Sequence, residues 1–515
     1  MRLKSYCAAI LSCSLLLSCT DLDEKLGSAL EEGTTGNINP AELLISAYSS
    51  LNGPYQHDNR WCLQELSTDA ALAPTRGGDW DDNGTHRAIH LHTWNADNSY
   101  MANTFGGLLT AIYQASNVLR YSPSAQQAAE ARFIRALAML DVLDLWGKVP
   151  YRENLEDFRE LPKTLTPQET IDFLISEMNE IMGALPASGA AYVANKNAAR
   201  ALLMKVYLNK GTFLNRENPT FDPADMSKVV ALANEITGYT ISAPGKYFDN
   251  FAPDNNVKST ENIFTLYNEE GVRGGGVDRA YWTIAHYNMT PGGWNGWATL
   301  SNYYDKFSAT DERRGIYYNY PADTTSNRTK NYKIQNVGFL QGQQTSWVTN
   351  KPLMARNPAT EPLAFSREIG IRTAGRTLET AGIRVIKYPF DFASRGQRNN
   401  DWVVYRYSDV LLMKAEAILR GGTPGGAADA LAIVNSIRTN RGVANLTALT
   451  LDALLDERAR ELYWEGWRRQ DLIRFGKFMQ AGQIKPADEN PRTLVYAIPS
   501  QQTAVNSNLE QNVGY

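Results

Sequence analysis

The sequence predicts a mainly α protein in which a helical scaffold is interrupted by one long, loop-rich segment. Apolar residues recur at helical spacing in a series of blocks, most of which come in pairs with short connections. Between residues 241 and 400 this periodicity fades, and glycine, asparagine, aspartate, threonine and tyrosine dominate. The helices before and after that segment should therefore pack together into one core.

The composition excludes some classes of function. The chain has 515 residues, of which 43% are apolar, enough for a large core. Its 51 basic and 55 acidic residues give a formal net charge of −4, and no basic stripe stands out, which argues against a nucleic-acid-binding surface. Five histidines and four cysteines leave little material for a zinc or iron–sulfur centre. No cofactor is expected.

The first 18 residues have the layout of a secretory signal peptide, because the basic residues Arg2 and Lys4 precede a short apolar run. That run is shorter than the roughly 20 residues that a membrane-spanning helix needs. It ends in the letters LLSC, which resemble a bacterial lipobox, so Cys19 is expected to be acylated and to anchor the chain in a membrane. The alternatives are ordinary secretory cleavage with Cys19 unmodified, and acylation of Cys13.

Residues 19–36 are acidic and contain glycine, which predicts a flexible tether between anchor and globule. Acidic residues after an acylated cysteine also resemble the surface-export signal of Bacteroidetes lipoproteins. Since Cys7 and Cys13 leave with the signal peptide and Cys19 carries lipid, Cys62 has no cysteine partner within the chain. No disulfide framework is expected.

The helical scaffold is expected in two parts, residues 37–240 and residues 401–515. The periodic blocks cover residues 40–51, 104–121, 124–146, 166–185, 196–210 and 225–237 in the first part, and 407–420, 427–441 and 451–478 in the second. Apolar residues cover more than one face of the block that ends at residue 146, so this helix should be buried, and Asp141 and Asp144 should find partners in the interior.

The last block carries opposite charges three residues apart, which places them on adjacent turns of a helix. These charges are Glu457 with Arg460, Arg458 with Glu461, and Glu465 with Arg468. We expect structural ion pairs at these spacings rather than catalytic groups.

Several segments carry a recognisable sequence in a fixed order. They read AEARFIRA to DLWGKVP at residues 129–150, NKNAARALLMKVYLNKG at 195–211, YRYSDVLLMKAEA at 405–417, ERARELYWEGWRRQDLIRFGK at 457–477, and an ending that contains IPS at 498–500. Together with Cys19 they span nearly the whole chain. In this combination the chain resembles the SusD/RagB family of nutrient-uptake lipoproteins of Bacteroidetes.

The resemblance implies a scaffold of tetratricopeptide-like helix pairs and a less regular subdomain, here residues 241–400, that carries much of the ligand surface. It also implies a lipid-anchored protein of the outer membrane, exposed at the cell surface. Such a protein captures a glycan, or a peptide in some members, and delivers it to a SusC-like, TonB-dependent outer-membrane barrel for polysaccharide utilisation. The helical scaffold would then dock on the barrel.

Candidate ligand residues follow from the chemistry of sugars. A glycan is held by flat aromatic faces together with Asn, Asp and Arg side chains, because sugar rings present C–H faces and hydroxyl groups. Aromatic residues are concentrated between residues 281 and 304, among glycine and asparagine rather than aliphatic residues. Trp282, Trp294 and Trp297 are therefore candidate stacking platforms, with local core packing as the alternative.

A second candidate is the turn-rich loop at residues 74–84, which presents Trp80 between carboxylates. It resembles a loop that contributes a stacking aromatic in a SusD-like subgroup, so Trp80 is the first choice for the platform. Asp79, Asp81 and Arg76 are candidate ligands for sugar hydroxyls, and turn capping or a salt bridge is the alternative for each.

Catalytic and metal-binding interpretations have little support. A glycosidase needs two carboxyls about 5–10 Å apart, one with a raised pKa, and the aspartates of the 74–84 loop are clustered instead. The sequence holds no nucleophile elbow, P-loop or zinc-protease motif. His86, His90 and His92 are close in sequence, but hydrogen-bonded packing is expected for them rather than metal ligation. A helix-repeat scaffold that binds other proteins is the remaining alternative.

Overall fold

The computed structural model describes residues 38–515 except for some internal positions. The exceptions are residues 57–58, 77–79, 81, 154, 156–158, 275, 278, 319–334, 372–377 and 395–397. The predicted signal peptide, Cys19 and the tether up to residue 36 lie outside the described residues. Pro40–Tyr515 forms one compact unit. Of the helices that the structure describes, none combines the length and the apolar character needed to cross a membrane.

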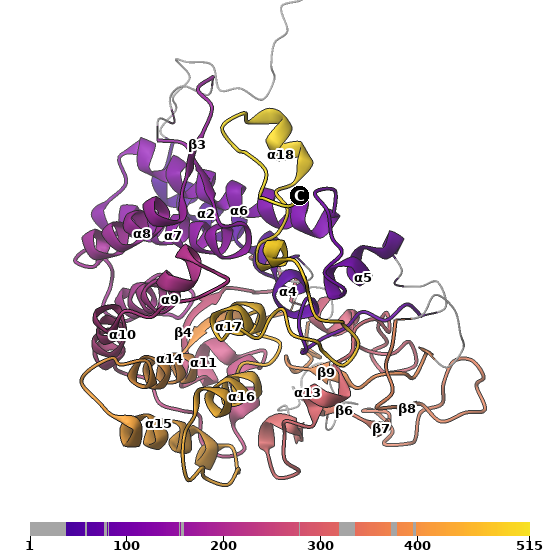
Figure 1. The fold of residues 1–515 in the computed structure, drawn as a ribbon. Coiled ribbons are helices and arrows are strands. Elements are labelled where there is room, and N and C mark those ends of the chain that lie inside the picture. The colour runs from indigo at the N-terminus through magenta and orange to yellow at the C-terminus, as the bar shows by residue number, and fades with distance from the viewer. Residues whose placement is uncertain are drawn as a thin grey trace, which may run out of the picture. The chain divides into compact units, whose positions relative to one another are not determined.

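The first part of the scaffold is a run of long helices, each packed on its neighbour (Figure 1). They are α2 (Pro40–Ser50), α6 (Ser99–Val118), α7 (Ala125–Trp146), α8 (Pro167–Ile181), α9 (Lys196–Leu214) and α10 (Pro223–Glu235). Helix α6 packs on α2 and α7, and the later helices pack in chain order. Side-chain oxygens cap the first turns of five of these helices. The caps are Asn98, Ser124, Thr166, Asn195 and Asp222.

Short elements connect this run. Helical turns are α3 (Asn52–Tyr55), α4 (Asn59–Trp61), the π-helix η1 (Cys62–Leu66), η2 (Asp82–Gly84), α5 (Thr85–His90) and η3 (Leu119–Tyr121). Strands β2 (Val149–Tyr151) and β3 (Lys163–Leu165) pair antiparallel between α7 and α8. The turns from α3 to α5 carry several residues of the site described below.

The second part of the scaffold packs on the first through α14. Its helices are α14 (Tyr407–Leu419), α15 (Ala427–Asn440), α16 (Leu451–Glu461) and α17 (Arg468–Arg474), followed by η7 (Pro491–Leu494) and α18 (Ser500–Val505). Helix α14 contacts α9 and α10 from the first part, and α15 and α16 from its own. The helices on the two sides of the loop-rich segment therefore share one core, and the predicted mainly α fold is confirmed.

The predicted single helix over residues 451–478 is wrong, because a turn divides it into α16 and α17. Trp464 and Gly466 in this turn have positive φ angles of 60° and 79°, a conformation that ends a helix. The turn is held from the first part of the chain: Trp464 Nε1 donates to the carbonyl of Ala70 at 3.1 Å, and the Gly466 N–H donates to Glu65 at 2.7 Å.

Helix α7 is buried around its circumference, as the sequence predicts. Asp141 accepts a hydrogen bond from Arg60 Nε at 2.8 Å and another from the Tyr55 hydroxyl. Asp144 accepts one from Gln64 at 2.7 Å. The prediction that both aspartates find partners in the interior is confirmed, and the partners come from α3, α4 and η1.

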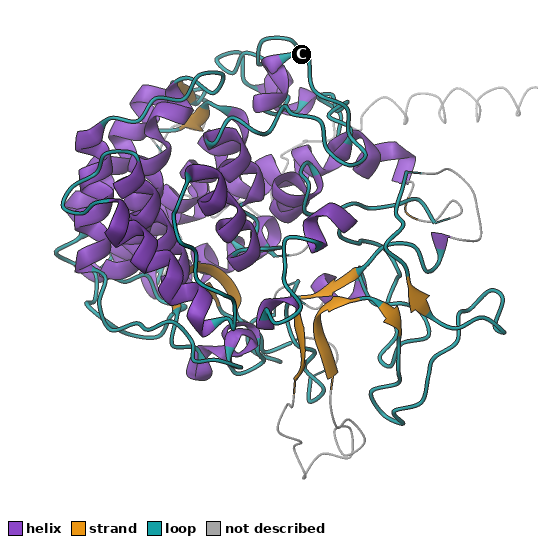
Figure 2. Cartoon of the chain, turned by 60° about the horizontal axis from the view of Figure 1, so that its bottom comes forward, coloured by secondary structure: helices purple, strands orange, loops and turns teal. Residues whose placement is uncertain are grey.

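Between α10 and α14 the chain forms short helices and small antiparallel sheets, which Figure 2 shows beside the long helices. Strand β4 (Asn262–Leu266) pairs with β10 (Trp402–Arg406). A three-stranded sheet has the order β5 (Gly315–Tyr318), β6 (Gln335–Leu340), β9 (Arg384–Ile386). Strand β7 (Gly342–Gln343) pairs with β8 (Ala364–Phe365). The helical turns are η4 (Tyr247–Phe251), α11 (Asn255–Lys258), α12 (Arg279–Trp282), α13 (Ser301–Tyr304) and η5 (Glu312–Arg314).

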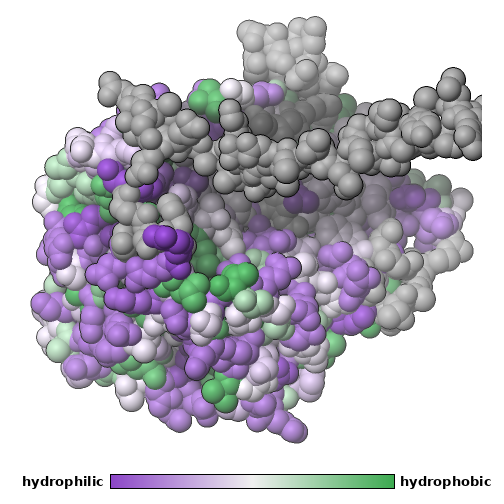
Figure 3. All heavy atoms as spheres, turned by 90° about the horizontal axis from the view of Figure 1, so that it is seen from above, coloured by the Kyte–Doolittle hydropathy of each residue, from purple (hydrophilic) through white to green (hydrophobic). Residues whose placement is uncertain are grey.

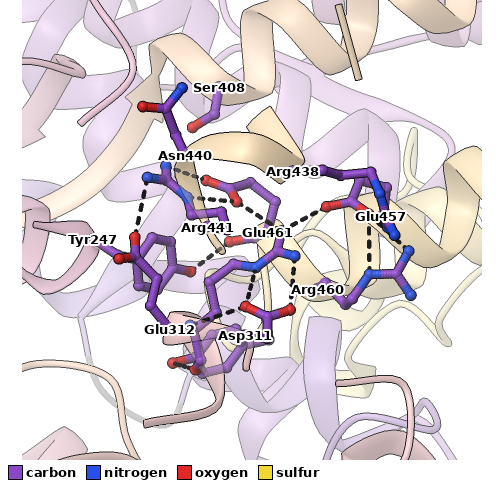
Figure 4. A network of polar contacts seen from close by, with 12 residues as sticks. Tyr247, Asp311, Glu312, Ser408, Arg438, Asn440, Arg441, Glu457, Arg460 and Glu461 are labelled. Atoms are coloured by element: carbon purple, nitrogen blue, oxygen red, sulfur yellow. Dashed lines mark hydrogen bonds and ion pairs between the residues drawn. The ribbon is translucent and has the colours of Figure 1, made fainter. Parts of the chain in front are cut away.

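A buried network of ion pairs ties this segment to α15 and α16 (Figure 4). Glu461 on α16 contacts Arg441 at 2.9 Å, and Figure 4 labels both residues. Glu461 also contacts Arg406 at 2.7 Å and Arg313 at 2.9 Å. Burial alone would raise the pKa of Glu461, but the three guanidinium groups hold it well below its usual range. Charged groups can stay in the interior here because each has an opposite charge in contact.

The predicted ion pairs within residues 451–478 are right for one pair only. Glu457 contacts Arg460 at 2.7 Å. The other four charges pair with different elements. Their partners are Asp409 and Asp471 for Arg458, the three arginines above for Glu461, Arg406 and Lys387 for Glu465, and Asp69 for Arg468. Spacing along a helix does not identify the partner of a charge that points into the core.

The surface is mixed in polarity on the face that Figure 3 displays. Where that face is not drawn in grey, hydrophobic residues lie in small groups among hydrophilic ones. Scattered apolar residues of this kind are normal on a protein surface.

Candidate functional site

Four tryptophans from three distant segments form one cluster that extends from the core to the surface. The Trp61 and Trp297 rings stack with centroids 4.5 Å apart and planes inclined by 11°. Trp80 meets Trp297 edge-on at 6.1 Å, and its Nε1 donates to the carbonyl of Trp294 at 2.8 Å. We call Trp61, Trp80, Trp294 and Trp297 the tryptophan cluster. The structure thus brings together the two candidate regions that the sequence separates by about two hundred positions.

The loop that carries Trp294 and Trp297 folds back on the end of α12. The Trp294 N–H donates to the carbonyl of Trp282 at 2.6 Å, and the Gly296 N–H donates to Thr283 at 2.7 Å. Glycine is required at position 296, because a Cβ there would lie 2.4 Å from the Trp80 ring and 2.6 Å from the Thr283 carbonyl oxygen. Trp80 itself has a φ of 64°, a strained conformation for a bulky residue, and these contacts hold it there.

Arg76, a predicted hydroxyl ligand, is buried and points at backbone instead. Its Nε and Nη2 donate to the Gly296 carbonyl at 3.0 and 2.8 Å, and its Nη1 donates to the carbonyls of Ala381, at 3.1 Å, and Leu378. Burial lowers the pKa of Arg76 to about 9. Arg76 therefore fastens three loops together and does not present its guanidinium at the surface.

The predicted platform residues differ in exposure. Trp294 is 43% exposed, and Trp80 and Trp282 are half-buried. Trp297 is only 2% exposed, because Trp61 covers one face and Trp80 approaches it edge-on, so Trp297 supports the platform from below. Asp79 and Asp81 lie outside the described residues.

A polar hollow of about 510 Å³ adjoins the tryptophan cluster. Its lining is formed by Asn52, Gly53, Gln56, Asn59, Ser99, Tyr100, Asn103, Gly274, Gly276 and Arg279. The hollow meets the cluster at Arg279, whose guanidinium carbon lies 5.4 Å from the centre of the Trp294 ring. Tyr100, which also lines the hollow, donates a hydrogen bond from its hydroxyl to the Asp82 carboxylate at 3.3 Å. The Asp82 side chain is 55% exposed. Sequence reasoning missed the residues of the hollow because they come from three separate segments with no local signal.

His86 lies beneath Trp80, and neither of its ring nitrogens has a hydrogen-bond partner among the described residues. Its ring centre is 5.9 Å from that of Trp80 and 4.7 Å from that of Tyr100. Burial lowers the pKa of His86 to about 4, so the ring is neutral near pH 7. His86 thus packs as an uncharged ring under the platform, and the predicted hydrogen-bonded packing is wrong for this histidine.

The other two histidines are hydrogen-bonded, as the sequence predicts. His90 Nδ1 contacts the Leu66 carbonyl at 2.9 Å, and His92 contacts Asp488 at 2.6 Å and the Ser67 carbonyl at 2.7 Å. In the part of the chain that the structure describes, His, Cys, Asp and Glu form no group of three or more that could hold a metal ion.

The geometry suits a ligand of one chemical kind. An exposed indole offers a flat apolar face, while the hollow beside it offers amide, hydroxyl and guanidinium groups. Among the described residues that line the hollow, Arg279 is the only charged one. A ring with an apolar face and many hydroxyl groups, and without strong charge, fits both parts.

Comparison with known proteins agrees with this geometry. The model of the SusD family matches residues 247–515. The starch-binding protein SusD of Bacteroides thetaiotaomicron is 26% identical over 424 residues, which cover 76% of this chain and 73% of that protein. A SusD-like protein of Formosa agariphila, P38, is 23% identical over 414 residues, covering 76% of this chain and 74% of that protein.

Solved structures show the same fold. A SusD superfamily protein from Parabacteroides distasonis superposes with a TM-score of 0.70 at 19% identity, covering 92% of this chain and 98% of that one. Surface glycan-binding protein A from Bacteroides thetaiotaomicron, in complex with laminarihexaose, gives a TM-score of 0.68 at 18% identity, with the same coverage of each chain.

Proposed function

Because the chain belongs to the SusD family, we propose that it is a cell-surface glycan-binding protein that captures oligo- or polysaccharide on the tryptophan cluster and delivers it to an outer-membrane transporter. The main support for the binding step is the position of the Trp294 ring, which is 43% exposed and lies beside the polar hollow. The Trp294 carbonyl accepts a hydrogen bond from Trp80. Stacking on this ring would orient the sugar, and the hollow would bind its hydroxyls.

The relatives indicate which glycans to test first. One is named as starch-binding and another was solved with laminarihexaose, and both ligands are neutral chains of glucose. Of the described residues that line the hollow, only Arg279 is charged, which supports a neutral glycan for this chain as well. Both relatives are named for glycan binding, which supports capture without cleavage as the proposed role.

Membrane attachment and partnership complete the proposal. Acylation of Cys19 would hold the protein on the outer membrane, and the tether at residues 19–36 would let the globule reach its partner. The partner is a SusC-like, TonB-dependent barrel, which the family role supports. The helical scaffold is the surface that would dock on it.

Affinity electrophoresis of the protein without its lipid anchor, from Thr20 onward, tests the binding step. Native gels that contain starch or laminarin should retard the wild-type chain, and Trp294→Ala should restore its free mobility. Tyr317→Ala is the matched control, because Tyr317 is an aromatic residue, is 75% exposed, and lies outside the cluster and the hollow. Its mobility should equal that of the wild type.

Other outcomes would support other functions. Cleavage of a glycan panel, lost on substitution of one carboxylate, would indicate a glycosidase. Binding of peptides without retardation by any glycan would indicate peptide capture. Co-purification with a barrel and no affinity for soluble ligands would indicate an interaction scaffold.

A further inference from the structure

An acidic side chain, Asp82, lies where the tryptophan cluster meets the polar hollow. It follows Trp80 by two positions, and its carboxylate Oδ2 accepts a hydrogen bond from the hydroxyl of Tyr100 at 3.3 Å. Tyr100 in turn lines the hollow. The Asp82 side chain is 55% exposed, so a ligand bound at the cluster and the hollow can reach it.

The backbone fixes the direction of this carboxylate. Asp82, Asn83 and Gly84 have positive φ angles of 47°, 52° and 77°. The Thr85 hydroxyl donates to the Asp82 carbonyl at 2.6 Å and so holds the turn closed. Aspartate and asparagine are among the few residues besides glycine that adopt this conformation. A carboxylate held by Thr85 through its backbone and by Tyr100 through its side chain is positioned before a ligand arrives.

The negative charge of Asp82 has no opposite charge in contact with it. Among the described residues, neither a lysine nor an arginine forms an ion pair with Asp82. His86 Nδ1 lies 3.9 Å from Asp82 Oδ2, but the His86 ring is neutral near pH 7 because burial lowers its pKa to about 4. The charge of Asp82 therefore acts on the ligand, within the Debye length of about 8 Å at physiological ionic strength.

Arg279 carries the opposite charge at the same place. Its guanidinium lines the hollow, and by itself it would favour an acidic sugar. Both charges act on the Tyr100 hydroxyl: burial raises the pKa of Tyr100, Asp82 raises it further, and Arg279 lowers it. Asp82 therefore offsets the attraction of Arg279 for an anion. A neutral sugar is repelled by neither charge, and its hydroxyls can donate to the carboxylate in charge-assisted hydrogen bonds.

We propose that Asp82 selects neutral glycans, by accepting a hydroxyl of the sugar bound at the tryptophan cluster and by repelling sugars that carry a carboxylate or a sulfate. No described residue donates to its Oδ1, so this oxygen can accept from a ligand. His86 contacts both Asp82 and Trp80, with its ring centre 5.9 Å from that of Trp80, so one oligosaccharide can reach the carboxylate and the platform. This role rests on the function proposed above.

Two polymers with one backbone separate charge from shape. They are laminarin and carboxymethylated laminarin, or starch and carboxymethyl starch if starch is the polymer that retards the wild type. Affinity for each polymer is measured by titration. Asp82→Asn removes the charge but keeps an acceptor for Tyr100 and a residue that tolerates positive φ. Asp172→Asn is the matched control, because Asp172 is exposed, accepts a hydrogen bond from Gln168 at 2.9 Å, and lies on α8, outside the cluster and the hollow.

We expect the wild type to bind the neutral polymer at least about tenfold more tightly than the carboxymethylated one, and this preference to fall to about threefold or less in Asp82→Asn. Affinity for the neutral polymer should itself fall about fivefold, because a neutral amide replaces a charged acceptor. Asp172→Asn should keep the wild-type preference. In the wild type, 1 M salt should also reduce the preference, because it shortens the Debye length to about 3 Å, and this measurement needs no substitution.

Equal affinity of the wild type for both polymers would overturn this role of Asp82. A preference that neither Asp82→Asn nor 1 M salt changes would overturn it as well. In both cases, retardation by the neutral polymer that is lost in Trp294→Ala would still support the function proposed above. If the wild type binds neither polymer, the proposed function fails and the role of Asp82 fails with it.

Discussion

Trp297 and Trp294 should respond to substitution in opposite ways, because one supports the platform and the other is its surface. Trp297 is 2% exposed and stacks on Trp61 at 4.5 Å, so Trp297→Ala leaves a cavity the size of an indole. Buried Trp to Ala substitutions cost about 3–5 kcal/mol of stability. Trp294 is 43% exposed, so Trp294→Ala should cost no more than about 1 kcal/mol.

The two substitutions should affect glycan affinity in the reverse order, so that Trp294→Ala weakens binding more than Trp297→Ala does. Trp80 donates to the backbone carbonyl of Trp294, so Trp294→Ala keeps that hydrogen bond while it removes the stacking face. Loss of a central tryptophan in an interface costs about 2 kcal/mol or more, roughly a thirtyfold loss of affinity. In Trp297→Ala protein that is still folded, glycan affinity should fall less than this, because the exposed ring remains.

The assays are urea unfolding followed by circular dichroism, and titration with the glycan that retards the wild type. The reasoning is refuted if Trp297→Ala unfolds at the wild-type urea concentration but has lost binding, because Trp297 would then be a ligand contact. It is equally refuted if Trp294→Ala is destabilised by several kcal/mol.

The remaining predictions concern the backbone, pH and the anchor. Gly296→Ala should displace Trp80 and weaken glycan binding at least tenfold, whereas Gly106→Ala, with no atom within 4 Å of its added Cβ, should bind like the wild type in the same gels. Burial raises the pKa of Glu65 from 4.5 to about 8 in the folded protein. Because the folded-state pKa lies above the unfolded-state pKa, the free energy of unfolding that protonated Glu65 contributes is complete below about pH 4.5 and is lost as pH rises to about 8. Glu65→Gln should remove that pH dependence, up to a few kcal/mol, in urea unfolding at pH 5 and pH 8; an unchanged slope would exclude Glu65 as its source. Cys19→Ala should move the protein from the membrane fraction to the soluble fraction on ultracentrifugation, and unchanged sedimentation would contradict the anchor.

The helices could be predicted from the sequence because their signals are local. Periodic apolar residues marked α7 and α9, and the density of apolar residues in α7 also predicted that Asp141 and Asp144 needed partners. The division between α16 and α17 was not predictable in this way, because Trp464 and its neighbours continue the apolar pattern through the turn. What ends α16 is a backbone conformation stabilised by contacts with residues nearly four hundred positions earlier.

The candidate site was predicted in part. The sequence indicated the region of Trp294 by its aromatic residues among glycine and asparagine, and the region of Trp80 as a turn-rich loop with a tryptophan between carboxylates. It could not distinguish Trp297 from Trp294, since they stand three residues apart in the same loop. Their exposure differs because Trp61, on a helical turn far away in sequence, stacks on Trp297 alone.

The ligand surface therefore depends on the scaffold through a continuous set of contacts. Trp464, in the turn between α16 and α17, donates to Ala70 and meets Trp61 edge-on at 4.8 Å. Trp61 supports Trp297, and Trp297 in turn contacts Trp80. Because close-packed side chains transmit displacement, a change at the α16–α17 turn should alter the platform without touching a ligand. Loops 74–84 and 281–304 can thus vary at their exposed rings while the buried indoles keep those rings in place, which is how a binding surface made of loops can be rigid enough to recognise a sugar.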